Sequence, residues 1–145
     1  MIVELPDLAA MQAYGARIAR ALRTGDVIAL SGGLGAGKTT LSRAILAALG
    51  HQGEVPSPTF TIIETYDDLT PRVVHADFYR LETPEEVDEL GLDDYREGAA
   101  LLAEWPENAG GFAHEPTCLS ITLESSGNGR KAIVEPGPDW LGREP

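Results

Sequence analysis

The residues from Gly32 to Thr39 form a glycine-rich segment that ends in a lysine and a threonine. Their order, Gly-Gly-Leu-Gly-Ala-Gly-Lys-Thr, matches the pattern G-x-x-x-x-G-K-[ST]. Glycines let the backbone wrap closely around a phosphate and turn its N–H groups inward. In such a loop Lys38 reaches the β- and γ-phosphates, and the hydroxyl of Thr39 coordinates Mg²⁺. The segment therefore predicts a nucleoside triphosphate site; the alternative is a glycine-rich turn with an unrelated lysine.

Two carboxylates close predicted strands, where a phosphate loop needs an acidic partner. Asp77 ends the apolar segment 72–77, and Glu104 ends the apolar segment 99–104. An acidic residue at the end of a neighbouring strand holds the Mg²⁺ shell in proteins with this loop. We expect Asp77 to fill that role and Glu104 to polarise the attacking water or to complete the metal shell. The alternatives are an ordinary aspartate in a turn and a helix-capping or solvated glutamate.

The segment Ser57-Pro58-Thr59 follows the helix that is predicted after the phosphate loop. GTPases use a switch loop at this place to sense the γ-phosphate and Mg²⁺, which makes Thr59 a further candidate for nucleotide contacts. A turn made rigid by proline is the alternative. The sequence contains no Asn-Lys-x-Asp segment, which reads guanine in many GTPases, and this favours adenine as the base.

Helices and short apolar segments alternate around these residues. Apolar residues at steps of three and four predict a helix from Asp7 to about Arg23, and the loop lies between a predicted buried strand, 27–31, and a predicted helix, 38–49. Further strands are expected at 59–66, 72–77, 99–104, 118–124 and 130–135, and a short helix from 83 to about 91. The order predicts an α/β protein with a three-layer P-loop NTPase fold. Its sheet is mainly parallel, with antiparallel strands from the first two of these segments or from the C-terminal pair.

The chain has 145 residues, which suits a single domain with one core. We expect that domain to span residues 1–145, with 136–145 as a loose tail. With Cys118 as its one cysteine, the chain can form neither an internal disulfide nor a multi-cysteine zinc site. The sequence shows no signal peptide and no apolar run long enough to cross a membrane, which favours the cytoplasm.

Acidic residues outnumber basic ones by 23 to 11, and the formal net charge is −12 at pH 7. Such a charge repels phosphate backbones, so we expect no strong direct binding to nucleic acid. The segment 82–97 contains eight of the acidic residues and one arginine, Arg96. We interpret it either as a solvated surface or as a docking surface for a basic patch on a partner.

With these residues in place, the chain resembles the TsaE family, the small bacterial ATPases of the machinery that makes threonylcarbamoyladenosine in tRNA. The resemblance runs from the N-terminal helix to about Ala132. The segments that carry it are 33–40, Ser57-Pro-Thr-Phe-Thr61, His75-Ala-Asp77-Phe-Tyr-Arg-Leu81, Glu85-Glu86, Gly91 and Glu104-Trp-Pro106. Gly33 departs from the family, which usually has an acidic residue there, and a local hydrogen bond or partner contact is in doubt for that reason.

The resemblance implies a Mg²⁺-dependent ATPase that acts with TsaB-like and TsaD-like partners and reaches tRNA only through them. TsaD transfers the threonylcarbamoyl group, and the ATPase resets or drives the cycle. As catalytic residues it implies Lys38, Asp77 and Glu104, and as metal ligands Thr39, Asp77 and Glu104. The residues it implies for ATP binding are Gly33, Leu34, Gly35, Ala36, Gly37, Lys38, Thr39, Thr40, Thr59, Gly129 and Arg130, with Asp7 or Leu8 as a further N-terminal contact.

Two other functions fit the phosphate loop. In a small-molecule kinase, a substrate hydroxyl replaces water at the γ-phosphate. Kinases with this loop usually have a lid and a substrate pocket, and the chain shows no arginine-rich lid. The other function is that of a module that senses ATP without useful turnover. Phosphate release without any acceptor favours an ATPase over a kinase.

Overall fold

One mixed sheet forms the middle of the molecule. A computed structural model describes residues 1–56 and 62–145. Within these residues the sheet has seven strands in the order β1-β7-β6-β2-β5-β4-β3. They are β1 (Ile2–Leu5), β2 (Val27–Ser31), β3 (Ile63–Tyr66), β4 (Arg72–Asp77), β5 (Ala99–Glu104), β6 (Cys118–Ser126) and β7 (Gly129–Pro136). The middle strands β4, β5, β2 and β6 are parallel, and the outer pairings are antiparallel. The expected α/β fold is confirmed, and both proposed antiparallel pairs occur.

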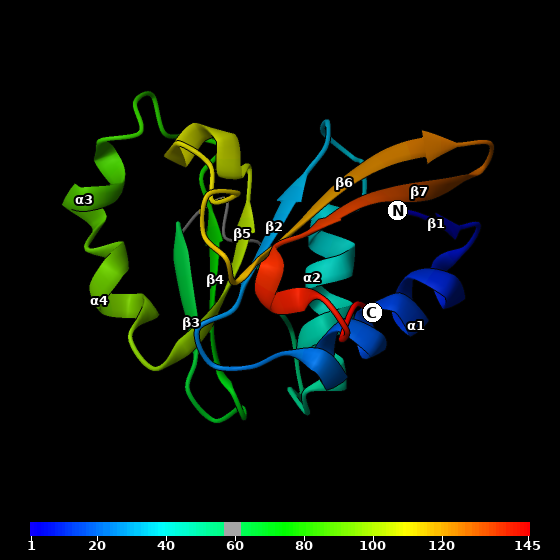
Figure 1. Cartoon of the computed structure of the whole chain (residues 1–145), viewed down its shortest axis with the longest axis horizontal. Helices are drawn as coiled ribbons and strands as arrows, with labels where there is room; N and C mark the ends of the chain where they lie inside the picture. The colour runs from blue at the N-terminus through cyan, green and yellow to red at the C-terminus, as the bar shows by residue number, and fades with distance from the viewer. Residues whose placement is uncertain (57–61) are drawn as a thin grey trace.

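The helices lie on both faces of this sheet (Figure 1). They are α1 (Leu8–Ala21), α2 (Lys38–Ala48), α3 (Glu86–Leu90) and α4 (Leu92–Arg96), with the short 3-10 turns η1 (Pro106–Ala109) and η2 (Pro138–Trp140). Helices α1 and α2 pack together on one face, and α3 and α4 lie at the β3–β4 end. Strand β2 is buried on both faces: Ile28 and Leu30 belong to the core beneath α1 and α2, and Val27 and Ala29 to the core on the other face.

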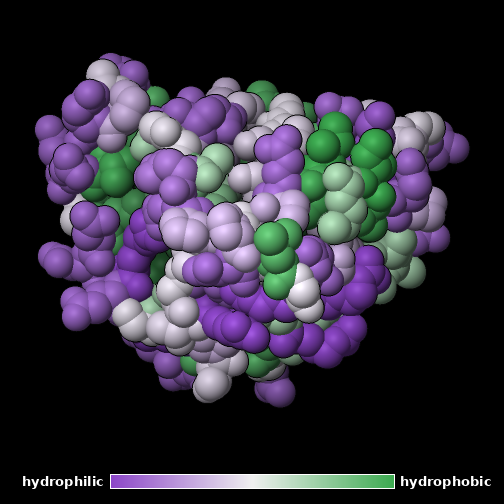
Figure 2. All heavy atoms as spheres, in the orientation of Figure 1, coloured by the Kyte–Doolittle hydropathy of each residue, from purple (hydrophilic) through white to green (hydrophobic). Residues whose placement is uncertain are grey.

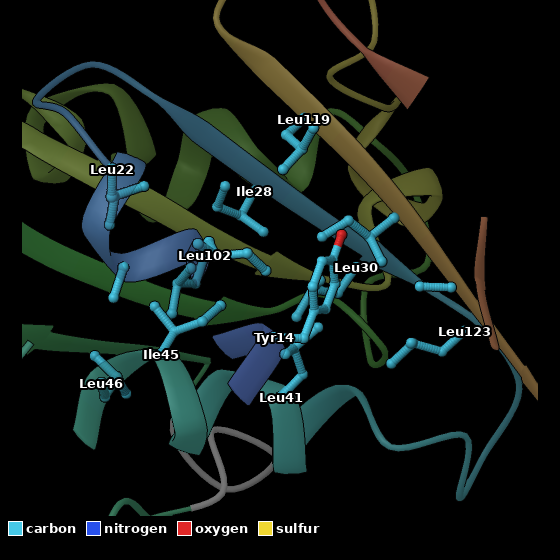
Figure 3. Packing of buried hydrophobic residues seen from close by; sticks show 14 of the residues in the cluster. Tyr14, Leu22, Ile28, Leu30, Leu41, Ile45, Leu46, Leu102, Leu119 and Leu123 are labelled. Atoms are coloured by element: carbon cyan, nitrogen blue, oxygen red, sulfur yellow. The ribbon is translucent and has the colours of Figure 1, made fainter. Parts of the chain in front are cut away.

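The core beneath α1 and α2 depends on a close approach of the two helices. Met11, Tyr14 and Ile18 follow one another at helical spacing, and all three are buried. Figure 3 shows Tyr14 of α1 beside Leu30 of β2 and Leu41 of α2. Gly15 permits this approach, because a Cβ atom there would lie 2.5 Å from the Cβ of Ala44. The helix begins where expected, since Asp7 caps it by accepting a hydrogen bond from Ala10 N at 2.8 Å.

The C-terminal segment differs from the expectation of a loose tail. Trp140 is fully buried, and its indole Nε1 donates to Thr117 O at 2.7 Å. The guanidinium of Arg143 donates to both carboxylate oxygens of Asp26 at 2.9 and 2.7 Å, and to Ala21 O at 2.6 Å. The expectation is therefore wrong for this part of the chain: Trp140 fastens the segment to the residue before β6, and Arg143 fastens it to the end of α1 and to the residue before β2.

The structure also differs from the sequence-based elements at several places. Of the strand expected at 59–66, residues 59–61 lie outside the described part of the chain, and β3 begins at Ile63. Strand β1, which pairs with β7 at the sheet edge, was not expected. The helix expected from residue 83 begins at Glu86, and its cap, Glu85, makes no side-chain capping bond. It ends at Gly91 as expected, but α4 follows at once.

No helix in the described parts of the chain is long and apolar enough to cross a membrane.

The acidic segment 82–97 contains α3 and α4. Figure 2 shows a mainly hydrophilic surface over this end of the molecule. Arg96 lies within the segment, and its guanidinium donates to both carboxylate oxygens of Glu115 at 3.0 and 2.6 Å. Because Arg96 is paired within the chain, the segment presents a strongly negative surface.

Candidate functional site

The glycine-rich loop joins the end of β2 to the first turn of α2, in the arrangement that the sequence predicts. Gly37 caps the helix with a φ of 105°, and Gly32 has a φ of 139°. At Gly32 a Cβ atom would also lie 2.6 Å from Leu123 O. An L side chain fits neither position, so the two glycines are required by the course of the loop. The loop leads into the N-terminus of α2, where backbone N–H groups without helical partners attract an anion.

The side chain of Lys38 folds back onto the loop and is held there by two loop carbonyls. Its Nζ donates to Gly32 O and Gly33 O, both at 2.7 Å, and lies 4.3 Å from the centre of the Trp105 ring. Burial lowers the pKa of Lys38, and nearby carboxylates, with Glu104 the strongest, oppose that shift. The ammonium therefore lies within the loop, between two loop carbonyls and near the carboxylates of the site.

Glu104 is the most constrained carboxylate of the site. Only 2% of its surface is exposed, and it accepts hydrogen bonds from Thr39 Oγ1 at 2.9 Å, Ser42 Oγ at 3.3 Å and His75 Nε2 at 2.5 Å. Burial raises the pKa of Glu104, but these hydrogen bonds, His75 foremost, and the Coulombic attraction to His75 outweigh burial and hold the pKa below its usual value. Glu104 is therefore a charged carboxylate at neutral pH, connected directly to the hydroxyl of the loop threonine.

Asp77 lies next to Glu104 at the same edge of the sheet. The two residues are partners in the parallel register of β4 and β5, so their Cα atoms lie side by side at the ends of these strands. Asp77 is buried and accepts a hydrogen bond from Tyr79 N at 2.9 Å on Oδ1. The structure thus brings together the predicted residues Lys38, Thr39, Asp77 and Glu104, which come from α2, β4 and β5.

These residues line a cavity of about 270 Å³. Its lining consists of Leu34, Gly35, Ala36, Gly37, Lys38, Thr39, Thr40, Asp77, Tyr79, Glu104 and Trp105. Trp105 follows β5 with a φ of 55°, and its ring lies 4.9 Å from that of Tyr79. A non-glycine residue in this left-handed region stores backbone strain, which is found mostly at functional sites. The pair forms an aromatic wall beside Lys38.

A second, smaller pocket of about 200 Å³ adjoins the loop on its other side. It is lined by Leu5, Pro6, Asp7, Leu8, Met11, Gly37, Thr40, Asn128, Gly129 and Arg130. Residues Asp7, Leu8, Gly129 and Arg130, which lie far apart in the sequence, therefore meet beside the loop. Thr59, the remaining candidate for nucleotide contacts, lies outside the described residues.

Arg130 also contacts the loop from outside. Its Nε donates to Ala36 O and its Nη2 to Gly35 O, both at 3.1 Å, and its Nη1 donates to Gly129 O at 2.9 Å. Arg130 therefore fastens the β6–β7 turn to the phosphate loop.

Two residues that contact Glu104, Ser42 and His75, were not assigned to the site by sequence reasoning. Ser42 lies one helical turn after Thr39, and this spacing places both on the same face of α2. His75 lies two residues before Asp77, and alternation along a strand places both on the same face of β4. The spacing therefore places Ser42 and His75 on the same faces as the predicted site residues, but spacing alone does not show that both side chains contact Glu104.

The oxygen atoms of the site suit Mg²⁺ bound together with a nucleotide. Hard cations prefer carboxylate and hydroxyl oxygens, and Thr39, Asp77 and Glu104 supply them. Within residues 1–56 and 62–145 no group of three or more His, Cys, Asp or Glu side chains could hold a metal ion by itself. Mg²⁺ is usually held by one or two carboxylates plus phosphates and water, so the residues fit this ion in a shared site and not in a protein cage.

A glycine loop between a doubly buried strand and a helix, with carboxylates at the ends of adjacent strands, makes this a protein with the P-loop NTPase fold. The particular branch follows from comparison with known proteins. The chain belongs to the TsaE family: the family model described as "Threonylcarbamoyl adenosine biosynthesis protein TsaE" matches residues 5–133.

Individual relatives agree with this assignment. The tRNA threonylcarbamoyladenosine biosynthesis protein TsaE of Haemophilus influenzae is 39% identical over 121 residues, which cover 79% of this chain and 77% of that protein. Its counterpart in Streptomyces coelicolor is 44% identical over 100 residues, which cover 67% and 68%. The crystal structure of YdiB from Bacillus subtilis matches with a TM-score of 0.79 and 28% identity, over 99% of this chain and 90% of that one.

Proposed function

We propose that this protein binds and hydrolyses ATP to support threonylcarbamoyladenosine (t⁶A) modification of tRNA. Membership of the TsaE family supports the tRNA-modification role. One observation carries the hydrolytic role: Glu104, a buried charged carboxylate, is hydrogen-bonded to Thr39 in the first turn after the phosphate loop. A base or metal-shell ligand beside the phosphate loop supports the hydrolysis of a nucleotide bound there.

The cavity lined by Lys38, Asp77 and Glu104 is our proposed site for the phosphates. Lys38 exchanges its contacts with Gly32 O and Gly33 O for phosphate oxygens and offsets their charge. Thr39 and, directly or through water, Asp77 hold Mg²⁺, which when bound neutralises charge on the phosphates. Glu104 orients the water that attacks the γ-phosphorus in line, or completes the metal shell. The bond between the γ-phosphorus and the bridging oxygen breaks, and ADP and phosphate leave.

The smaller pocket is our proposed site for adenine. It adjoins Gly37 and Thr40 of the loop, and Leu5, Leu8 and Met11 give it an apolar lining. A flat base suits such a lining, with polar groups at the rim to orient it. Gly129 and Arg130 form part of that rim, and Arg130 also braces the phosphate loop.

We further propose that the ATPase acts through TsaB-like and TsaD-like partners in the cytoplasm, and meets tRNA only through them. The charge supports the indirect contact, because a net charge of −12 repels a phosphate backbone. The negative surface of segment 82–97 suits a basic patch on a partner. Reversing the charge of Glu85, Glu86 and Asp88 should then weaken assembly and change the salt dependence of assembly. Unchanged assembly leaves the segment as a solvated surface.

The test is Mg²⁺-ATP hydrolysis by the purified chain, alone and with a TsaB–TsaD pair. We expect slow turnover alone and faster turnover with the pair. The Glu104→Ala variant should lose the activity, while Glu135→Ala, which removes an exposed glutamate of β7, should keep it. A hydrolysis rate that does not change when the partners are added would indicate a free-standing enzyme. ATP turnover that occurs only when a small-molecule acceptor is present would indicate a kinase.

A further inference from the structure

His75 is a fully buried histidine behind the site. It lies in β4, and its Nε2 is 2.5 Å from Oε2 of Glu104, across the parallel pairing of β4 with β5. Neither the nucleotide loop nor the proposed metal ligands include it. Its one polar contact among the described residues is with the carboxylate that the proposed mechanism uses.

The donor in this contact is the histidine. A charged carboxylate only accepts hydrogen bonds, so the imidazole must carry a hydrogen on Nε2. Its other nitrogen, Nδ1, is buried and has no hydrogen-bond partner among the described residues. Burying a ring nitrogen without a partner is unfavourable, and an apolar side chain would avoid it. The gain that offsets this cost is the contact with Glu104.

The two oxygens of Glu104 have different partners. Oε2 accepts from His75 and, over a longer distance of 3.3 Å, from Ser42. Oε1 accepts from Thr39 at 2.9 Å. Because His75 and Ser42 hold one oxygen from the side of the sheet and of α2, the other oxygen is turned toward Thr39, which lines the cavity.

We propose that His75 is a positioning residue for ATP hydrolysis: its Nε2–H fixes Oε2 of Glu104, so that Oε1 meets Thr39 and the water or metal shell. The inference rests on the proposed function, because Glu104 needs orientation only if the site performs chemistry. Without the imidazole, Ser42 alone holds Oε2, and the carboxylate rotates away from the productive direction. The loss appears in the chemical step and not in nucleotide binding, which depends on the loop.

Three substitutions separate this role from simple packing. His75→Gln places an amide N–H near the position of Nε2, His75→Asn places one near Nδ1, where it cannot reach Glu104, and His75→Leu removes the donor but keeps the volume. With the TsaB–TsaD pair and saturating Mg²⁺-ATP, we expect Asn and Leu to lower kcat by roughly 10- to 100-fold, with KM within about 3-fold. We expect Gln to restore kcat to within about 3-fold of the unmodified protein.

The double variant His75→Leu/Glu104→Gln tests whether the two residues act together. If His75 acts through Glu104, then His75→Leu lowers kcat no further once Glu104 is Gln. An unchanged kcat in His75→Leu overturns the proposal, and so does an equal loss with either residue at position 104. Gln and Asn variants that lose the same activity also overturn it, because packing then explains the effect. If His75→Leu unfolds, the difference in kcat between the closely matched Gln and Asn variants still tests the proposal.

A second readout separates this inference from the proposed function. The affinity for a non-hydrolysable ATP analogue is measured with Mg²⁺ and with EDTA. If the unmodified protein hydrolyses nothing with any partner pair, the proposed ATPase activity fails. Because His75 acts on the chemical step, the Asn, Gln and Leu variants should bind the analogue within about 3-fold of the unmodified protein in both buffers. A His75→Asn variant that loses analogue binding overturns the inference, because a disturbed loop or Mg²⁺ site then explains its lower kcat.

Discussion

Thr39 and Glu104 are 65 positions apart in the sequence, yet a hydrogen bond of 2.9 Å joins Oγ1 of the threonine to Oε1 of the glutamate. It connects the first turn of α2 with the end of β5. A hydroxyl that donates its hydrogen to a carboxylate keeps its oxygen lone pairs for a metal ion. In the proposed site, Thr39 would therefore bind Mg²⁺ through these lone pairs, while Glu104 fixes the direction of its hydroxyl.

Replacing Thr39 by valine should remove the Mg²⁺-dependent part of nucleotide binding. Valine matches threonine in shape but has no hydroxyl, so it neither binds the metal nor donates to Glu104. We expect the affinity for Mg²⁺-ATP to fall by about tenfold, with little change in EDTA. Calorimetric titration in the two buffers measures both values. Thr39→Ser keeps the hydroxyl and serves as the control; a serine variant as weak as valine contradicts the prediction.

Lys38→Ala should abolish productive nucleotide binding, since the phosphates lose their principal positive charge in the loop. We expect ATP affinity to fall by a factor of roughly 30 or more, in line with the loss of a charge-assisted hydrogen bond. The chain offers a matched control in Lys131, its other lysine, which lies 3.7 Å from a carboxylate oxygen of Glu124. Lys131→Ala should bind normally, and normal hydrolysis by Lys38→Ala would show that the phosphate-loop assignment is wrong.

Arg130→Gln should weaken ATP binding without changing the chemical step. The arginine holds the loop carbonyls of Gly35 and Ala36, so its loss leaves the loop less well ordered before the nucleotide arrives. We expect KM to rise by about 3- to 10-fold with kcat nearly constant, as for an interaction that only supports binding. Lys131→Gln, one residue away, controls for the change in charge. A fall in kcat of the same size would place Arg130 in the chemistry itself.

The unmodified protein should lose stability at high pH because of Tyr14, and the Tyr14→Phe variant should lack this part of the loss. Burial raises the pKa of Tyr14 to about 12, and its hydroxyl has no hydrogen-bond partner among the described residues. Between pH 10 and the raised value, the unfolded chain releases this proton and the folded chain keeps it. The free energy of unfolding therefore falls as pH rises, by up to roughly 2 to 3 kcal/mol.

Urea unfolding of both proteins from pH 8 to pH 12 measures this effect. The two curves should run in parallel near pH 8 and diverge above pH 10, where the phenylalanine variant loses less stability. Because the change also removes a buried hydroxyl without a partner, the variant should be at least as stable as the unmodified protein at pH 8. Identical slopes above pH 10 would contradict the assignment.

Arg143→Ala should destabilise the protein by about 2 to 3 kcal/mol. Asp26 is 2% exposed, and the substitution leaves its buried carboxylate with one hydrogen-bond donor among the described residues, the backbone N–H of Arg23 at 2.7 Å. Denaturant unfolding at pH 7 measures the loss. Arg20→Ala, an exposed arginine in the last turn of α1, should change stability by no more than about 0.5 kcal/mol. Equal effects of the two substitutions would show that the pairing with Asp26 contributes little.

Local patterns were sufficient for the centre of the fold and for the residues around the phosphate loop. The strand before the loop, the helix after it and the two strands that end in Asp77 and Glu104 all appear where periodicity and apolar runs predict them. Their meeting also follows from the sequence, because parallel strands bring their carboxyl ends to one edge of a sheet. The roles of these residues toward a nucleotide remain predictions.

Long-range contacts account for what was missed. Strand β1 shows little pattern, because among its residues Leu5 alone is buried and its partner strand lies near the other end of the chain. The C-terminal segment looked loose because the partners of Trp140 and Arg143, Thr117 and Asp26, are remote in the sequence. The contact of His75 with Glu104 likewise depends on how two strands are placed side by side.

The close contact between Gly15 of α1 and Ala44 of α2 has a consequence for evolution. A methyl group on residue 15 would overlap the methyl group of residue 44, because the two Cβ atoms would be 2.5 Å apart. The two positions therefore share room for one methyl group, and the helices must separate if both carry one. Among relatives that keep this helix spacing, alanine at position 15 should occur together with glycine at position 44, so that the two sites covary.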